Sequence, residues 1–188
     1  SAKLRNAVAG EYTTKAGRTS DPAEQKNWAQ KSLPHLDIAL EVHPRYKNAW
    51  LLRGNAYFYL DQFEQAVIAY NKALEIDPSY KEARDNLQLA YRDGGRHFGE
   101  KEGKIQKSLR WLREAYNRDS RNYETIRLLG VAHGVAGHNQ KAVKFFKKAL
   151  ELKPEDANAL YNLGNAYFHA GKPDSGKIYR SRALRIDP

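Results

Sequence analysis

The chain has 188 residues, 41% of them hydrophobic, so it is long enough for one domain with a sizeable core or for a short array of repeats. With 32 Lys and Arg against 22 Asp and Glu, its net charge of +10 favours acidic partners, nucleic acid or anionic membrane surfaces without choosing among them. The absence of cysteine excludes disulfides, thiolate metal ligands and a thiol nucleophile. Because no run of about 18 apolar residues occurs, we expect no transmembrane segment in this chain.

The sequence leaves the location of the protein open. The lack of cysteine fits a reducing compartment such as the cytoplasm, and a periplasmic location fits equally well. The first residues lack the apolar stretch of a signal peptide. The chain begins within an expected helix and stops at Asp187-Pro188, so we expect a piece of a longer protein whose other parts carry any targeting or membrane-anchoring signal.

An internal repeat organises the chain. The pentapeptide GNAYF occurs at residues 54–58 and again at 164–168, within two segments whose small and aromatic residues fall at matching offsets. A third segment, ETIRLLGVAHGVAGHNQKAVKFFKKALELKP, places Gly130 34 residues before Gly164. Apolar positions at helical spacing in each segment predict two helices per unit, with one buried stripe on each helix.

This pattern resembles the tetratricopeptide repeat (TPR), a 34-residue helix–turn–helix unit with small and aromatic residues at fixed positions and a proline after its second helix. The resemblance covers the chain as five repeats, expected at residues 3–46, 47–80, 81–122, 123–156 and 157–188. It implies an all-α fold, a right-handed α-α superhelix (solenoid) in which first helices line a concave face and second helices lie outside.

Two repeats stay in phase only if they carry insertions. The third needs about eight extra residues around 94–104, and because this stretch holds four glycines we expect a loop there. The first needs about ten, and its sequence Asp21-Pro22-Ala23-Glu24 is typical of a capped helix start, which predicts a lengthened second helix. At the other end, Ile178, Leu184 and Ile186 lack a following helix, so we expect either further chain or self-association through this uncapped C-terminal helix.

No constellation of catalytic residues is found in the sequence. The six histidines are scattered over four repeats, and His133 and His138 flank a turn at a spacing poorly suited to binding one metal ion. His133 stands where the TPR pattern has tyrosine, so we interpret it as a packed histidine. The stretch GEKEGK at residues 99–104 is too short for a phosphate-binding loop and has no Ser or Thr after its lysine. We therefore expect no catalysis, cofactor or metal in this segment.

The resemblance implies a peptide-binding groove on the concave face, since TPR arrays usually hold a partner's peptide segment there. The side chains expected to point into this groove come from the solvent-facing stripe of the first helices. They are Asn48, Leu51, Asn55, Tyr59, Glu82, Asp85, Asn86, Arg127, Asn158, Tyr161, Asn162 and Asn165. Asparagine amides can donate to and accept from an extended peptide backbone. The alternative is structural, because asparagine is common at these positions in TPR sequences.

One TPR subclass grips the C-terminal carboxylate of heat-shock chaperones with lysines and an arginine beside two asparagines. Asn55 and Asn86 are in place here, but Leu51, Glu124 and Leu128 stand where the pattern requires basic residues. A bound carboxylate would meet an acid in place of an ammonium group, so the sequence argues against this clamp. The acidic residues of the expected groove instead favour a partner with basic or amide-rich segments.

Positive charge gathers on the second helices of the third and fourth repeats. Six residues at equivalent offsets are expected to form a basic patch on the convex side: Lys107, Arg110, Arg113, Lys141, Lys144 and Lys147. This patch is either a solvated outer face or an electrostatic site for an acidic partner, membrane headgroups or nucleic acid. Because Trp111 is the one aromatic residue in this stripe, specific nucleic-acid recognition is not expected.

Three functions remain open on the sequence. The first is a non-catalytic protein–protein interaction scaffold or adaptor that binds an extended peptide or helix in its concave groove. The second is a TPR recruitment or regulatory domain of a larger enzyme, for example a glycosyltransferase. The third is binding of an acidic partner, a membrane surface or nucleic acid by the basic patch. Repeat proteins of one fold serve many processes, so the pattern does not name the partner.

Overall fold

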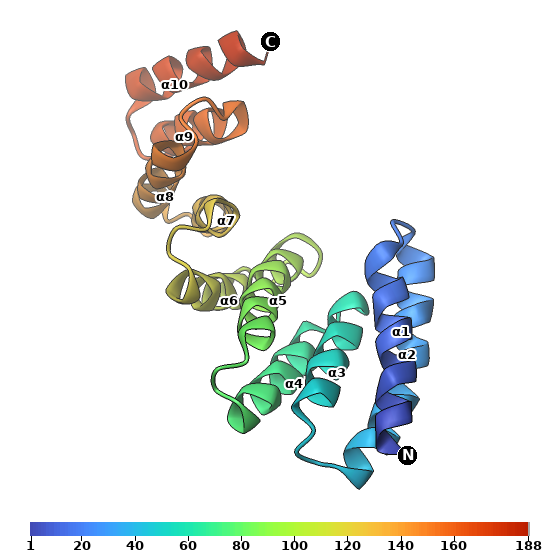
Figure 1. Cartoon of the computed structure of the whole chain (residues 1–188). Helices are drawn as coiled ribbons and strands as arrows, with labels where there is room; N and C mark the ends of the chain where they lie inside the picture. Colours follow the sequence, from blue (N-terminus) through green and yellow to red (C-terminus); the bar gives the residue numbers. More distant parts are fainter. Residues whose placement is uncertain (188) are drawn as a thin grey trace. The chain divides into compact units, whose positions relative to one another are not determined.

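The computed structural model describes residues 1–187, and this part of the chain holds ten α-helices and no strand. They are α1 (Ala2–Arg18), α2 (Pro22–Val42), α3 (Lys47–Tyr59), α4 (Phe63–Ile76), α5 (Lys81–Glu100), α6 (Ile105–Arg118), α7 (Tyr123–Val135), α8 (Asn139–Leu152), α9 (Ala157–His169) and α10 (Pro173–Ile186). Helices that follow one another in the chain pack together as pairs (Figure 1). The all-α fold class of TPR-like helix pairs, predicted from the sequence, is confirmed. Among the described residues, no helix is both long enough and apolar enough to cross a membrane.

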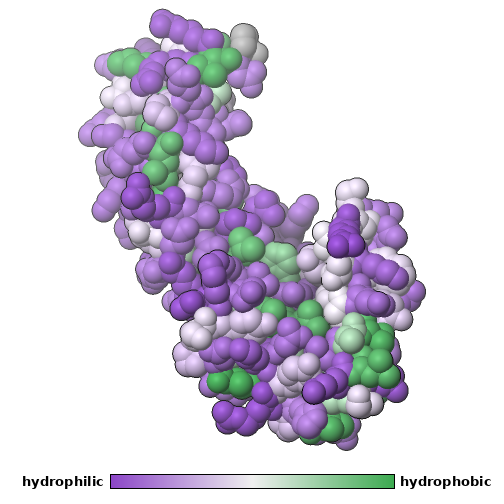
Figure 2. Space-filling model, viewed as in Figure 1, coloured by the Kyte–Doolittle hydropathy of each residue, from purple (hydrophilic) through white to green (hydrophobic). Residues whose placement is uncertain are grey.

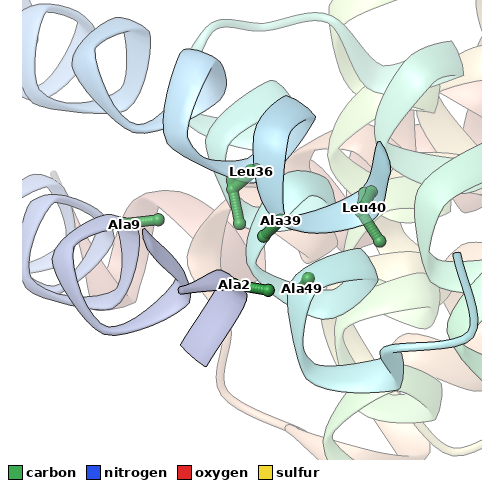
Figure 3. Packing of buried hydrophobic residues seen from close by; sticks show 6 residues of the cluster. All are labelled: Ala2, Ala9, Leu36, Ala39, Leu40 and Ala49. Carbon is green, nitrogen blue, oxygen red and sulfur yellow. The ribbon is translucent and has the colours of Figure 1, made fainter. Parts of the chain in front are cut away.

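The chain divides into two compact units, Ser1–Gly94 and Gly95–Pro188, so that α5 contributes its first part to one unit and its last turns to the other. In the first unit, α1, α2 and α3 meet around small and aliphatic side chains. Six residues form this core (Figure 3): Ala2, Ala9, Leu36, Ala39, Leu40 and Ala49. The four alanines among them let the helices approach closely, as the small residues of the repeat pattern predict.

Glycines at the helix crossings keep the repeats in register. A Cβ atom added to Gly54 of α3 would lie 2.3 Å from the Tyr70 ring of α4, so glycine is needed where these helices cross. Gly130 of α7 and Gly164 of α9 stand in the same relation to the residue sixteen positions further along the next helix, with distances of 2.8 and 2.6 Å. The three glycines therefore occupy equivalent crossing points, as the repeat predicts.

The insertion in the third repeat is helical, so the prediction of a loop was wrong. α5 runs to Glu100, and only residues 101–104 form the turn before α6. Gly95 occupies the crossing position against Leu112. The repeat period of 34 residues would place this position at Gln88, seven residues earlier in the chain. Seven residues make nearly two helical turns, so they lengthen the helix while rotating its buried stripe only slightly. The eighth extra residue lies in the turn, which has four residues where the turn between α3 and α4 has three.

The insertion in the first repeat also lies in a helix. α2 has 21 residues against 14 in α4, and it begins at Pro22 as the sequence predicts. The Asp21 carboxylate caps it by accepting hydrogen bonds from the backbone N–H groups of Ala23 (2.8 Å) and Glu24 (3.4 Å). Proline at the first position loses nothing, because an N–H there has no partner within the helix. The predicted lengthening of the second helix is confirmed.

Candidate functional site: an amide pair, a basic patch and a buried histidine

Two asparagines from neighbouring first helices lie side by side in the first unit. The Oδ1 atom of Asn55 on α3 accepts hydrogen bonds from Nδ2 of Asn86 on α5 and from the Tyr70 hydroxyl, each at 2.9 Å. Burial raises the pKa of the Tyr70 hydroxyl, which therefore stays protonated and able to donate. Neither bond uses the Asn55 amino group or the Asn86 carbonyl oxygen. One donor group and one acceptor of the pair are thus not used by these two hydrogen bonds.

The amide pair borders a small pocket. Asn55, Asn86 and Tyr70 line it together with Phe58, Tyr59 and Leu89, and its volume is about 110 Å³. Sites for free small-molecule ligands usually measure about 300–1,000 Å³. This pocket therefore suits one side chain of a longer ligand, with amide groups beside it for the main chain.

Acidic side chains stand next to the amide pair on α5. Glu82 and Asp85 are both exposed, and Asp85 forms an ion pair with Lys81 one turn earlier. An exposed pair of this kind contributes between about 0 and 1 kcal/mol to stability. A basic group of a ligand can therefore replace Lys81 at small cost.

Asn48 and Leu51 of the expected groove are placed differently from the others. Asn48 Oδ1 accepts a hydrogen bond from Nδ2 of Asn6 (2.7 Å), and Asn48 Nδ2 donates to the Tyr80 hydroxyl (3.3 Å). These bonds join α1, α3 and the turn before α5, so Asn48 helps to hold neighbouring repeats together. Leu51 is only 7% exposed and offers little surface to a ligand. Neither residue fits the role expected from the sequence.

In the second unit, the expected groove residues of α9 carry free amides. Asn158 is exposed and Asn162 and Asn165 are half-buried. Tyr161 is 41% exposed, and the guanidinium group of Arg180 on α10 lies 5.2 Å from the centre of its ring. The cation fixes one face of the tyrosine, which leaves its edge and the neighbouring asparagine amides accessible.

Arg127 of α7 is already engaged within its own helix. Its guanidinium group donates hydrogen bonds of 3.0 and 2.7 Å to the two carboxylate oxygens of Glu124. A two-point pair of this geometry is stronger than a single contact between point charges. Arg127 would therefore have to leave Glu124 before it could hold a ligand.

The basic patch of the second unit consists mainly of exposed, unpaired cations. Arg110 and Arg113 of α6 and Lys141, Lys144 and Lys147 of α8 are all exposed. None of the ion pairs found among the described residues involves any of these five. On the face that Figure 2 shows, hydrophilic residues prevail and apolar ones gather in small groups.

A seam of side chains joins the two helices that carry the patch. The rings of Tyr116 on α6 and Phe145 on α8 meet edge to face at 5.8 Å, and the Lys148 ammonium group donates to the Tyr116 hydroxyl. Lys107 departs from the expectation, because it is half-buried with its ammonium group 3.7 Å from the centre of the Phe98 ring. Five of the six residues expected in the patch are therefore exposed, and Lys107 is the exception.

His133 is a packed side chain, as interpreted from the sequence. It is 5% exposed, its ring is stacked on Phe145 at 5.4 Å, and its Nδ1 lies 3.3 Å from Nδ1 of His138. Burial and the nearby charges of Lys141, His138 and Arg113 lower the pKa of His133 to about 4, so it is neutral at physiological pH. In the part of the chain that the structure covers, no three His, Asp or Glu side chains gather as metal ligands would.

Comparison with known proteins agrees with the helix-pair fold. Residues 23–160 match the family model described as the cytochrome c-type biogenesis protein H TPR domain, and residues 145–177 match a tetratricopeptide repeat model. The chain belongs to the TPR family. TPR proteins bind protein partners, and their fold is typical of interaction scaffolds.

This TPR protein also resembles individual proteins. Human tetratricopeptide repeat protein 6 is 28% identical over 202 residues, which cover 86% of this chain and 36% of the human protein. Anaphase-promoting complex subunit 3 of Schizosaccharomyces pombe is 26% identical over 161 residues, covering 84% and 23%. The chain thus spans about a third or less of these relatives. A solved structure of MamA (AMB-1) superimposes with a TM-score of 0.68 at 17% identity, over 98% of this chain and 93% of MamA, which shows a shared fold.

Proposed function

We propose that this TPR protein is a non-catalytic interaction scaffold, which binds an extended peptide or helix of a protein partner along the first helices of its repeats. The observation that carries the proposal is the amide pair of Asn55 and Asn86 beside a pocket for one side chain.

The amide pair can form hydrogen bonds with the backbone of a peptide. The Asn55 amino group would donate to a peptide carbonyl, and the Asn86 carbonyl oxygen would accept from a peptide N–H. The pocket beside them would take the side chain between these two contacts. Glu82 and Asp85 would attract a basic residue, so the preferred ligand is a segment rich in basic or amide side chains.

The experiment is a screen of immobilised extended peptides with the whole chain and with Asn86→Ala. Asn86 is chosen because loss of Asn55 would also leave the buried Tyr70 hydroxyl without its hydrogen-bond acceptor. We expect the best peptides to be basic and to bind Asn86→Ala about tenfold more weakly, which corresponds to the loss of about one hydrogen bond. Asn27→Ala, on the exposed side of α2, is the control and should bind as wild type. Equal binding by wild type and Asn86→Ala would show that peptides dock elsewhere.

A further inference from the structure

The net positive charge of the protein resides almost entirely in the second unit. Residues 95–188 contain 19 Lys and Arg against 10 Asp and Glu, which accounts for nine of the ten net charges. Within this unit, the second helices α6, α8 and α10 carry twelve basic residues and three acidic ones, whereas α7 and α9 together carry one of each. Attraction for anionic groups is therefore concentrated on the second helices.

An apolar crevice of about 260 Å³ lies between two of these helices, α8 and α10. Leu150 of α8 and Tyr179 of α10 line it and are half-buried, and Leu160 and Leu163 of α9, both 0% exposed, lie behind them. Tyr179 is held in place by its stack on the Tyr167 ring, at 5.5 Å and 13° between planes. The crevice is large enough for an aliphatic or aromatic side chain, which would contact the half-buried side chains of Leu150 and Tyr179.

Cations border the crevice on both helices. Lys147 of α8 and Arg182 of α10 line it and are exposed, and the Arg182 guanidinium group lies 5.8 Å from the centre of the Tyr179 ring. Glu151 is the one carboxylate among the residues that line it. Because Lys147 also belongs to the basic patch, the crevice continues into the row of unpaired cations on α8 and α6.

We infer that this crevice and the adjoining cations form a second docking site, which binds an acidic amphipathic segment of a protein partner. One apolar side chain of that segment fills the crevice, and its carboxylates lie beside Lys147 and Arg182. The site is separate from the amide pair of the first unit, where Glu82 and Asp85 favour the opposite charge. This site can therefore be tested independently of the proposed function.

The crevice favours a peptide over the other polyanions. A lipid surface offers headgroups to the cations but no single apolar side chain that would enter the crevice between them. Single-stranded nucleic acid binds sequence-independent sites through phosphate contacts together with stacking of bases on aromatic rings, and the Tyr179 ring is already in contact with Tyr167 and Arg182. A peptide gains both from the charges and from burial of its apolar side chain.

The test uses short fluorescein-labelled peptides and the whole chain in anisotropy titrations at physiological salt. The first probe has Glu and Asp around a central leucine, the second replaces the leucine with serine, and the third replaces the acids with lysine. We expect the first to bind at least about tenfold more tightly than either of the others. Equal binding of the leucine and serine peptides would overturn the assignment of the crevice.

Charge variants locate the site. Lys147→Glu combined with Arg182→Glu should weaken binding of the leucine peptide by about tenfold or more, and the Gln versions of both should give a smaller loss. Arg45→Glu with Arg84→Glu changes the net charge equally at exposed positions of the first unit and should leave binding within about twofold. Glu151→Gln should tighten binding. If both double variants weaken binding equally, or if duplex DNA or phosphatidylserine vesicles compete as well as the peptide, the site is a general anionic surface and the proposal is wrong.

Discussion

Acidification is expected to destabilise the second unit through His133. Burial, Lys141, His138 and Arg113 lower its pKa to about 4, from 6.5 for an unperturbed histidine. Between these two values the unfolded chain binds a proton that the folded chain excludes. The free energy of unfolding therefore falls as the pH drops through 6.5, and this loss is complete below about pH 4. The difference in pKa lowers the free energy of unfolding by about 3 kcal/mol in total. Roughly 2 kcal/mol of this is lost between pH 7 and pH 5.

The repeat itself supplies the matched variant, His133→Tyr. Tyr167 occupies the equivalent position in the next repeat, where its ring stacks on Tyr179 at 5.5 Å and 13°. His133 stacks on Phe145 in the same way, at 5.4 Å and 11°. Tyrosine should therefore fit the site, and it does not ionise in the acidic range.

Urea unfolding of both proteins at pH 7 and pH 5, followed by far-ultraviolet circular dichroism, measures the effect. Other titrating groups are common to the two chains and cancel in the comparison. We expect wild type to lose about 2 kcal/mol more than His133→Tyr between the two pH values. Since helix-pair arrays can unfold in steps, hydrogen exchange of the α7 amides provides the local value. The same pH dependence in both proteins would refute the reasoning.

Two further substitutions test the fold. Gly130→Ala would place a Cβ atom 2.8 Å from the Phe146 ring and should cost about 1–3 kcal/mol, whereas Gly134→Ala, with its Cβ 3.9 Å from that of Ala142, should stabilise α7 by about 0.5–1 kcal/mol. Thermal midpoints rank the three proteins, and similar midpoints for both variants would contradict the crossing point at Gly130. Asp21→Ala removes the cap of α2 and should lower the free energy of unfolding by about 1 kcal/mol, while Asp21→Asn keeps an acceptor and should lose less. Urea titrations that show no loss for Asp21→Ala would mean that the cap is not formed in solution.

The helix pairs could be predicted from the sequence because their determinants repeat. Gly54, Gly130 and Gly164 each allow a close crossing, so one physical requirement recurs at a fixed spacing. The third repeat was misassigned because glycine is usually a turn former, and four of them suggested a loop. Gly95 and Gly99 are instead required by contacts within the helix pair, where added Cβ atoms would lie 2.7 and 2.9 Å from side chains of α6. Packing outweighed local propensity there.

The candidate sites were predictable only in part. Asn55 and Asn86 occupy positions that the repeat pattern identifies, and they lie together. The structural role of Asn48 could not be foreseen, because its partners Asn6 and Tyr80 are 42 and 32 residues away in the sequence. The crevice between α8 and α10 arises from ordinary core leucines, which carry no distinctive sequence signal.

The long α5 helix restricts how this segment can vary in length among related chains. Each added residue turns the direction of the following side chains by 100°, so seven residues bring them back to within about 20°. A gain or loss of three, four or seven residues keeps Gly95 roughly toward Leu112, whereas five would turn it away by about 140°. Viable length changes within this helix should therefore come in steps close to whole turns.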